Sequence, residues 1–349
     1  ATASLEAALH ILGIGEGDEV IVPAYTYTAS ASPVVHKGAK LVIIDSAPET
    51  FEMDYDKVAE AINENTKAVI PVDLGGMICD YDRIFEIVES KKDLFKPANK
   101  LQAAIGRVAV ISDGAHAFGS VKNGVKAGAI ADFTSFSFHA VKNLTTAEGG
   151  ALAWRKIDGV DNDELYHELQ LYSLHGQSKD ALSKNKAGAW EYDVVYPAYK
   201  CNMTNINAAI GIAQLERYEG LLARRRVLNA RYEAALEKLG IKVMHHYTEG
   251  MTSTGHLYLV RIPGASVDDR NAVIQDMAER EIACNVHYKP LPMMTAYKNL
   301  GFDIADYPNA YHQYENLISL PIFSTMTDEQ NEYVIENFVD ILKKRGLIK

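Results

Sequence analysis

The segment 135–143, SFSFHAVKN, carries the side chains with the most reactive chemistry in the sequence. An apolar, strand-like stretch ends here in Ser137, His139 and Lys142. A lysine just past the end of a buried strand can form a Schiff base with an aldehyde cofactor, provided that burial or a nearby cation lowers its pKa. The alternative is a surface lysine in a loop, which is the commoner role of such a lysine taken alone.

A carboxylate follows a second apolar stretch. The run 108–112 leads directly into Asp113, and His116 lies three residues further on. Ligands of open α/β sheets bind at the carboxyl ends of the strands. Asp113 could therefore pair with the protonated pyridine nitrogen of pyridoxal phosphate (PLP), an interaction that makes the ring an electron sink. A carboxylate that caps a helix or a turn is the alternative.

Two further segments could hold parts of such a ligand. The residues from Thr2 to Ser4 open a helix, whose free N–H groups and positive dipole end bind phosphate, although Thr2 could also be an N-cap. The segment 23–27 follows a strand end, and an aromatic side chain there could stack on a flat cofactor or pack in the core. The glycines of segment 13–17 follow a helix rather than a strand, which argues against a dinucleotide-binding loop.

Composition excludes several classes of protein. The 349 residues include 35 basic and 46 acidic side chains, a net charge of −11, which argues against a non-specific nucleic-acid binder. The three cysteines are far apart and form no CxxC pair, so we expect a reducing, cytoplasmic compartment and no metal site. No apolar run reaches the roughly 18 residues of a membrane helix, and no secretory signal is recognised.

The elements that would position these side chains follow from hydrophobic periodicity. Strand-like runs that alternate with helical segments predict βαβ crossovers and a mostly parallel, buried sheet. A long helix at 218–239 then introduces a smaller α+β region, with a strand expected at 283–288 and a capping box at 327–330. The lysine-rich segment 91–107 is expected to be a solvated surface loop. The strands are expected at 20–23, 41–44, 68–72, 108–112, 133–138 and 150–154, and helices at 2–12, 54–62 and 80–88.

Together these segments resemble the DegT/DnrJ family of PLP-dependent nucleotide-sugar aminotransferases over nearly the whole chain. The resemblance implies an α/β fold of the aspartate-aminotransferase type (fold type I). It implies a large PLP-binding domain at 1–217 with a mostly parallel seven-stranded sheet, and a small α+β domain at 218–349. Family members have some tens of residues ahead of this start, so we expect the N-terminal part of the large domain to be missing. The most specific pieces are SFSFHAVKNLTTAEGG (135–150), ISDGAHAFGS (111–120), YKCNMTNINAAIGIAQLER (199–217), NVHYKPLP (285–292) and SLPIFSTMTDEQ (319–330).

The resemblance also implies a role for each residue of a PLP site. An obligate homodimer is implied, because one asparagine would reach the phosphate of the neighbouring subunit's cofactor. Two residues near the mouth of the site are weaker candidates for binding the diphosphate of a substrate. The implied set is Lys142 for the Schiff base, Asp113 for the pyridine nitrogen, His116 beside the ring hydroxyl, Tyr27 on the ring face, Ser137, Thr2 and Ala3 for the phosphate, Asn202 for the neighbouring site, and His287 and Tyr288 at the mouth.

The implied reaction moves an amino group from L-glutamate to a sugar ketone. Lys142 argues against the dehydratases of the family, in which histidine replaces this lysine. The sequence LTTAEGG favours amination at C4 of a nucleotide-linked 4-keto-6-deoxy sugar, with Ala147 in place of the commoner glycine taken as a minor difference. A UDP-linked, N-acetylated sugar for cell-surface polysaccharide biosynthesis is preferred. The alternatives are a PLP-binding regulatory protein of the same fold, a C3-aminating or dTDP- or GDP-sugar aminotransferase, and another class of PLP enzyme.

Overall fold

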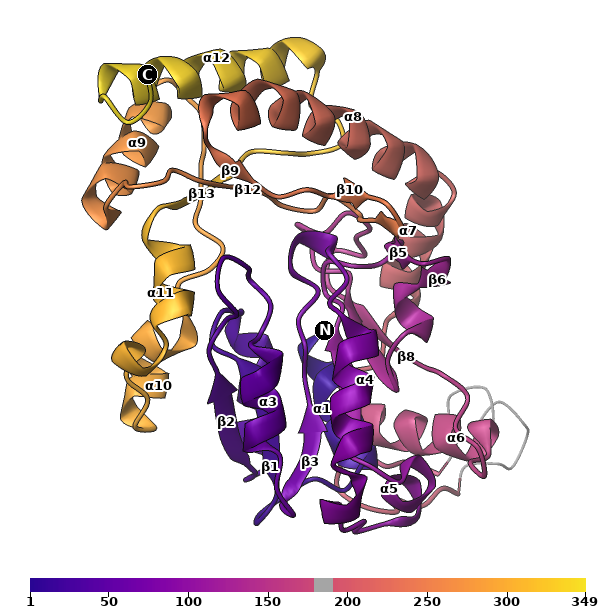
Figure 1. The fold of residues 1–349 in the computed structure, drawn as a ribbon. Helices are drawn as coiled ribbons and strands as arrows, with labels where there is room; N and C mark the ends of the chain where they lie inside the picture. Colours follow the sequence, from indigo (N-terminus) through magenta and orange to yellow (C-terminus); the bar gives the residue numbers. More distant parts are fainter. Residues whose placement is uncertain (179–190) are drawn as a thin grey trace.

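A computed structural model describes residues 1–178 and 191–349 and places a mixed, mostly parallel sheet at the centre of the chain (Figure 1). The strand order is β2-β1-β3-β4-β7-β8. Neighbouring strands pair in parallel except β7 and β8, which are antiparallel. The predicted α/β class is therefore confirmed. The strands are β1 (Glu19–Pro23), β2 (Lys40–Ile44), β3 (Thr66–Val69), β4 (Ala109–Asp113), β7 (Phe133–Ser137) and β8 (Gly150–Trp154).

The central sheet has six strands in the described residues rather than the seven expected. Each of the six apolar runs predicted before residue 155 forms one strand of this sheet. Strand β8 lies at the edge, and its residues are only partly buried, whereas every residue of β4 and β7 is buried. The difference in count arises because, within the described ranges, no further run pairs with β8.

Helices cover both faces of this sheet, and the strand residues alternate between the two cores. Val20 and Val22 pack with α1 (Thr2–Ile11), α2 (Ser32–His36) and α6 (Asn162–Ser173), whereas Ile21 packs with α3 (Tyr55–Ala61) and α4 (Tyr81–Ser90). A sheet buried on both faces explains why its strands read as continuous apolar runs.

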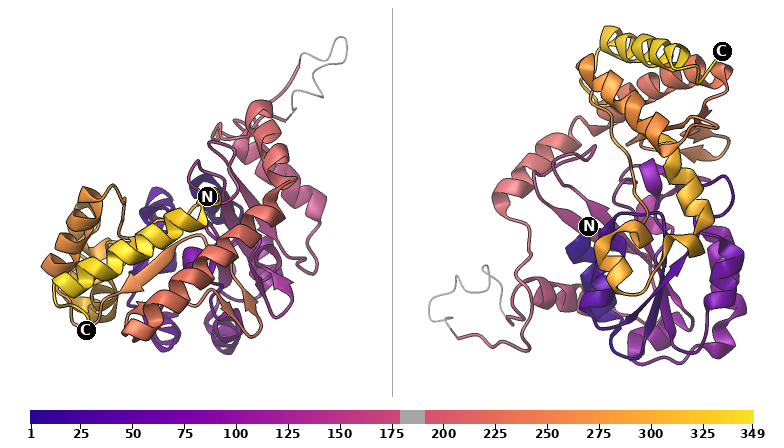
Figure 2. Two further views of the ribbon diagram at one scale, coloured as in Figure 1. Left: turned by 90° about the horizontal axis from the view of Figure 1, so that it is seen from above. Right: turned by 90° about the vertical axis from the view of Figure 1, so that its left-hand side faces the viewer.

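The C-terminal residues form a second layer above one end of the central sheet (Figure 2). Strands β9 (Lys242–Val243), β12 (Tyr258–Arg261) and β13 (Leu317–Leu320) pair antiparallel. Their core is closed by α8 (Tyr218–Leu236), α9 (Val267–Glu279) and α12 (Asp328–Lys344). The predicted capping box at Thr327 and Gln330 is present. The division of the chain at residue 217 stays a prediction. The remaining elements include α7 (Asn205–Leu215), α10 (Thr295–Asn299), α11 (Pro308–Glu315), and the short strands β5 (Val121–Lys122), β6 (Val125–Lys126), β10 (Tyr247–Thr248) and β11 (Met251–Thr252).

The strand predicted at 283–288 is wrong. This segment makes a single bridge to β13, between Asn285 and Ser319. The backbone groups of His287 and Tyr288 instead bond to the side-chain hydroxyl of Tyr25. A ladder cannot continue where a side chain has taken the backbone hydrogen bonds, so the segment is irregular.

The segment 91–107 is not simply a solvated loop, as was expected. It contains α5 (Lys100–Ile105), and Gln102 within it is 1% exposed. The amides of Asn99 and Gln102 donate to the carbonyl oxygens of Ile11 (3.2 Å) and Leu12 (2.6 Å). The last carbonyl groups of a helix lack partners within it, and these amides supply them for α1.

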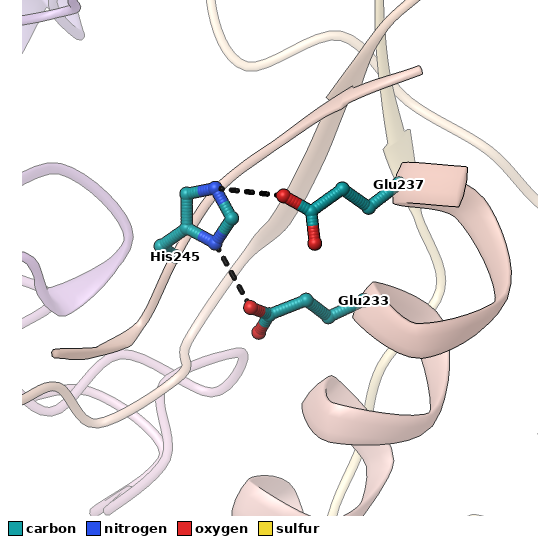
Figure 3. A group of neighbouring side chains, drawn as sticks. All are labelled: Glu233, Glu237 and His245. Carbon is teal, nitrogen blue, oxygen red and sulfur yellow. Dashed lines mark hydrogen bonds and ion pairs between the residues drawn. The ribbon is translucent and has the colours of Figure 1, made fainter. Parts of the chain in front are cut away.

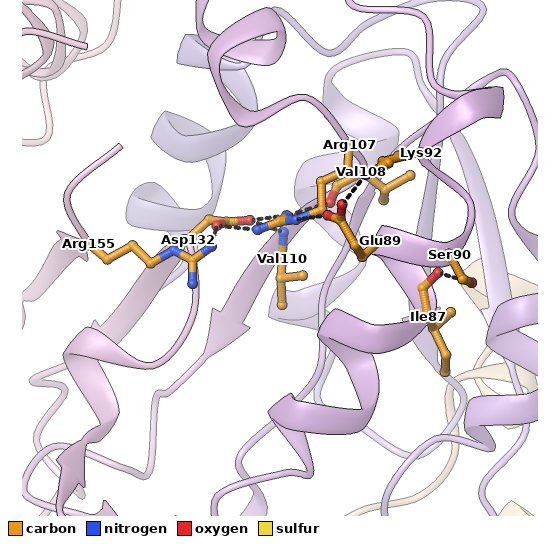
Figure 4. A network of polar contacts seen from close by, with 9 residues as sticks. All are labelled: Ile87, Glu89, Ser90, Lys92, Arg107, Val108, Val110, Asp132 and Arg155. Atoms are coloured by element: carbon orange, nitrogen blue, oxygen red, sulfur yellow. Dashed lines mark hydrogen bonds and ion pairs between the residues drawn. The ribbon is translucent and has the colours of Figure 1, made fainter. Parts of the chain in front are cut away.

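A buried ion-pair network joins the strands that carry the predicted site residues (Figure 4). Both carboxylate oxygens of Asp132 accept from the guanidinium of Arg107, at 2.7 and 3.0 Å. Arg155, just after β8, pairs with the same carboxylate at 2.8 Å. The backbone N–H of Val110 in β4 also donates to it, at 2.9 Å. Asp132 thus fixes β4, β7 and β8 relative to one another.

We predict that Asp132→Ala lowers the free energy of unfolding by about 3–5 kcal/mol, because it leaves the buried Arg107 guanidinium without its carboxylate. Chemical denaturation followed by circular dichroism measures this. Glu89→Gln is the matched control, since Glu89 is exposed and lies 3.9 Å from Arg107, and its loss is expected to cost less than about 1 kcal/mol. Equal effects of the two variants would contradict the prediction.

The described part of the chain holds no helix with the length and apolar character that a bilayer crossing requires.

Candidate active site

A cavity of about 420 Å³ lies where the central strands end. Asp113 is the last residue of β4 and Ser137 the last residue of β7, and both line it. The parallel sheet therefore brings together side chains that are far apart in the sequence, as the carboxyl ends of such strands do. Of the predicted site residues, the lining includes Thr2, Tyr27, Asp113, His116, Ser137, Lys142, His287 and Tyr288.

The first turn of α1 forms one wall of this cavity. Thr2 begins the helix, and no side chain caps its first N–H groups in the described structure. A Cβ atom on Gly150 would lie 2.9 Å from the nitrogen of Ala1 and 2.7 Å from the carbonyl oxygen of Phe136, so glycine permits the close approach of β8 to the helix start. Free N–H groups at a helix start can hold an anionic group such as a phosphate.

Asp113 is held by donors on both carboxylate oxygens. The hydroxyl of Ser30 donates to Oδ2 (2.6 Å), and the backbone N–H of Ala115 donates to Oδ1 (3.2 Å). Ser30 is itself hydrogen-bonded to Thr26 at 2.7 Å, and both are buried. Each carboxylate oxygen can accept a second hydrogen bond, so Asp113 could also accept one from a protonated ring nitrogen in the cavity.

Lys142 lies in the turn that follows β7. Its backbone N–H donates to the carbonyl oxygen of His139 at 2.9 Å, which closes the turn. Burial of the side chain lowers the pKa of Lys142 to about 8, and the charge of Asp113 opposes this shift only in part. Desolvation disfavours the ammonium form, so near neutral pH the site holds far more uncharged amine than a surface lysine offers.

The residue after this lysine is fixed by the C-terminal part of the chain. Asn143 donates from Nδ2 to the carbonyl oxygen of Thr254 (3.0 Å) and accepts at Oδ1 from Nδ1 of His256 (2.8 Å). Both ends of the amide are thus paired, and burial lowers the pKa of His256 well below its usual value. Sequence analysis missed His256 and Thr254, since more than 100 residues separate them from Asn143.

His116 contributes a neutral ring. The backbone N–H of Gly75 donates to Nδ1 (3.1 Å), so the proton of the neutral imidazole is on Nε2, which lies 3.3 Å from the hydroxyl of Tyr288. Burial is the main cause that lowers the pKa of His116 well below its usual value. The ring is therefore uncharged near neutral pH.

His287 also lines the cavity and is uncharged near neutral pH. Burial, and then the charge of Lys142, lowers the pKa of His287 to about 4. An imidazole that is uncharged at neutral pH can offer hydrogen bonds to a ligand but no positive charge to a diphosphate.

Ala3 and Asn202 do not line the first cavity. They line a neighbouring cavity of about 560 Å³, which shares Thr2 and Gly149 with the first. Asn202 is exposed at the start of the segment that leads into α7.

Ala147, taken as a minor difference from glycine, has a structural cost. Its φ angle is +65°, in the left-handed region that glycine adopts readily. An alanine there is strained by about 1–2 kcal/mol.

A separate group of ionisable side chains lies among the C-terminal elements (Figure 3). Glu233 and Glu237 are one helical turn apart, and the ring of His245 lies between them, with Nδ1 at 2.9 Å and Nε2 at 3.7 Å from the two carboxylates. These three residues could hold a metal ion if their side chains moved. In the structure the ring nitrogens face different carboxylates, which is the arrangement of a surface ion pair.

Two known proteins are similar in sequence to nearly the whole chain. The chain is 36% identical over 332 residues to protein MJ1066 of Methanocaldococcus jannaschii, across 94% of this chain and 80% of that protein. It is 34% identical over 348 residues to the spore coat polysaccharide biosynthesis protein SpsC of Bacillus subtilis, across 98% and 84% of the two chains.

Solved structures agree as well. Spr1654 of Streptococcus pneumoniae, described as a sugar aminotransferase, matches in its PMP form with a TM-score of 0.96 and 53% identity, over 98% of this chain and 86% of that one. Its PLP form matches with a TM-score of 0.94 and 52% identity, over 98% and 85%. The family model described as the DegT/DnrJ/EryC1/StrS aminotransferase family matches residues 1–339. The chain belongs to this family and is a PLP-dependent aminotransferase.

Proposed function

We propose that the protein moves an amino group from L-glutamate to the C4 ketone of a nucleotide-linked 4-keto-6-deoxy sugar, UDP-linked and N-acetylated, for cell-surface polysaccharide. The observation that carries the proposal is the amine of Lys142, whose pKa is lowered to about 8, in one cavity with Asp113. The sequence LTTAEGG supports C4, and the likeness to a polysaccharide biosynthesis protein supports the pathway class. Three free cysteines support a reducing, cytoplasmic compartment.

The residues of the cavity fit the parts of PLP. When bound, PLP supplies a ring that accepts the electrons of a carbanion. Lys142 Nζ would hold its aldehyde group, and Asp113 would keep the ring nitrogen protonated. The phosphate would be held by the hydroxyl of Ser137 and by the start of α1, where Thr2 lines both cavities and Ala3 lines the neighbouring one.

Further side chains would orient the ring and move the proton. Tyr27 would lie against the ring face, and the imidazole of His116 would lie beside the ring hydroxyl. Lys142 Nζ, once released, would take the proton from the α-carbon of the amino donor and return it during the transfer, which is general acid–base catalysis by a positioned amine.

The second subunit of a homodimer is proposed to cover α7. This helix buries only Gly211 among its described residues, whereas Ile206 is 78% and Ile212 61% exposed. Exposed apolar surface of this kind marks an interaction site in a soluble protein. Asn202 precedes the helix, so a partner on α7 would lie beside it, which supports its proposed role toward the neighbouring subunit's cofactor.

The proposed half-reaction predicts a spectral change. The purified protein with PLP is expected to show the visible absorption band of a lysine-bound cofactor, and L-glutamate is expected to bleach it. A nucleotide-linked 4-keto sugar is then expected to restore the band faster than the matched 3-keto sugar.

Lys142→Arg keeps a positive charge but cannot form the linkage with PLP, so turnover is expected to fall by at least about 10³-fold. The exposed Lys298→Arg is the control.

The outcomes separate the alternatives. A band that glutamate leaves unchanged would indicate another donor or a regulatory protein, and faster restoration by the 3-keto sugar would contradict amination at C4.

The lowered pKa of Lys142 predicts how its reactivity depends on pH. The uncharged amine is the nucleophile, so the rate at which the cofactor-free protein binds PLP covalently is expected to rise with pH and to reach half of its maximum near pH 8. Stopped-flow absorption between pH 6 and 10 measures this. A rate that rises steeply up to pH 10 without levelling off above pH 8 would show that the amine keeps the usual lysine pKa of about 10.4 and is not desolvated.

If α7 forms the proposed interface, carboxylates introduced on this helix are expected to dissociate the dimer. Ile206→Asp with Ile212→Asp would place two carboxylates in an apolar contact, at a cost that separates the subunits. Sedimentation velocity is expected to show a dimer for the unmodified chain and a monomer for this variant. Leu300→Asp is the control, because Leu300 is 51% exposed on another part of the surface. A double variant that remains a dimer would remove α7 from the interface.

A further inference from the structure

One buried hydroxyl holds a segment of the C-terminal region against the cavity. We call residues 285–291 the strap. The hydroxyl of Tyr25, just after β1, donates to the carbonyl oxygen of His287 (3.0 Å) and accepts from the N–H of Tyr288 (2.9 Å). The N–H of Leu291 donates to the carbonyl oxygen of Ala24 (2.9 Å). Tyr25 is 1% exposed, so its hydroxyl bonds are shielded from water.

The strap is attached on its other side to β13. The backbone N–H of His287 donates to Oγ of Ser319 (3.2 Å), and Nδ1 of the same imidazole lies 2.9 Å from this oxygen. Contacts from Tyr25 and from Ser319 of β13 thus fix the backbone of two successive residues. Because both of these residues line the cavity, the position of the strap determines what the cavity presents to a ligand.

The hydroxyl of Tyr288 has a defined orientation as a result. Gly75 donates to Nδ1 of His116, so Nε2 carries the proton and donates toward the oxygen of Tyr288 at 3.3 Å. A hydroxyl that accepts in this direction keeps its own hydrogen for another partner. Tyr288 lines the cavity, so that hydrogen is available to an oxygen atom of a bound molecule.

We propose that Tyr25 is a positioning residue of the active site. Its hydroxyl holds the backbone at Tyr288 so that the phenol stays against His116 and donates to an oxygen of the bound keto sugar. The proposal rests on the proposed function for the nature of this ligand, but the placement of the strap by Tyr25 does not depend on it.

Tyr25→Phe tests the proposal by removing one atom. The ring still packs against Phe51, whose centroid lies 5.1 Å away, but two buried backbone groups lose their partner. Amide hydrogen exchange at Tyr288, measured by mass spectrometry on the PLP-loaded protein, is expected to become about tenfold faster. The KM for the keto sugar is expected to rise about tenfold with little change in kcat, while the glutamate half-reaction keeps its rate.

Tyr232→Phe is the matched control. Tyr232 is also fully buried, and its hydroxyl donates to the carbonyl oxygen of Pro321 (2.7 Å) in the C-terminal core. This variant loses a comparable hydrogen bond, so it is expected to lower stability while exchange at Tyr288 and the KM stay unchanged.

A double-mutant cycle with Tyr288→Phe separates positioning from a general structural role. If Tyr25 acts through the phenol, the double variant is expected to cost no more in kcat/KM than Tyr288→Phe alone. Additive costs would overturn the proposal, as would unchanged exchange at Tyr288. A Tyr25→Phe chain that does not fold would assign the hydroxyl to folding instead and would also overturn it. Hydrogen exchange can be measured without turnover. If the keto sugar is not a substrate but exchange at Tyr288 is faster in Tyr25→Phe, the proposed function is rejected and the placement of the strap by Tyr25 is supported.

Discussion

An uncharged amine beside a carboxylate is the constraint on which the active site depends. Water would favour the ammonium form of Lys142, so the cavity must exclude water while it keeps Asp113 fixed by two donors. The neighbouring histidine rings are uncharged for the same reason, because burial lowers the pKa of His116, His256 and His287. Added positive charge would favour the free amine further, but each buried cation would itself need a partner. Neutral rings provide hydrogen bonds without that cost.

Much of the fold and part of the site could be predicted from sequence because the signals are local. Apolar runs predict the strands of the central sheet. A parallel sheet brings together the residues that follow two of these runs, Asp113 and Lys142, at the carboxyl ends of the strands. The resemblance added residues such as Tyr27 and Ser137, which also line the cavity. Their chemical roles stay predictions of the resemblance.

The parts that were missed depend on contacts across long sequence separations. The apolar pattern of 283–288 resembles a strand, but Tyr25, more than 260 residues earlier, takes its backbone hydrogen bonds. His256 gives no local signal for its bond to Asn143. The polar composition of 91–107 indicated solvent exposure, yet Gln102 is buried against the end of α1. In each case one side chain satisfies a distant backbone or amide group, which periodicity cannot reveal.

The capping of α1 by Asn99 and Gln102 has a consequence for how the cavity meets its ligand. The first turn of this helix lines the cavity with N–H groups that no side chain of the described residues caps, and the carbonyl groups at its end accept from Asn99 and Gln102. A helix secured at its far end does not need to become ordered when an anion reaches its start. The entropic cost of ordering the helix is then incurred during folding rather than during binding. More of the interaction energy with the anion therefore contributes to affinity. The segment 91–107 therefore preorganises the start of α1 for a ligand, although none of its residues lines the cavity.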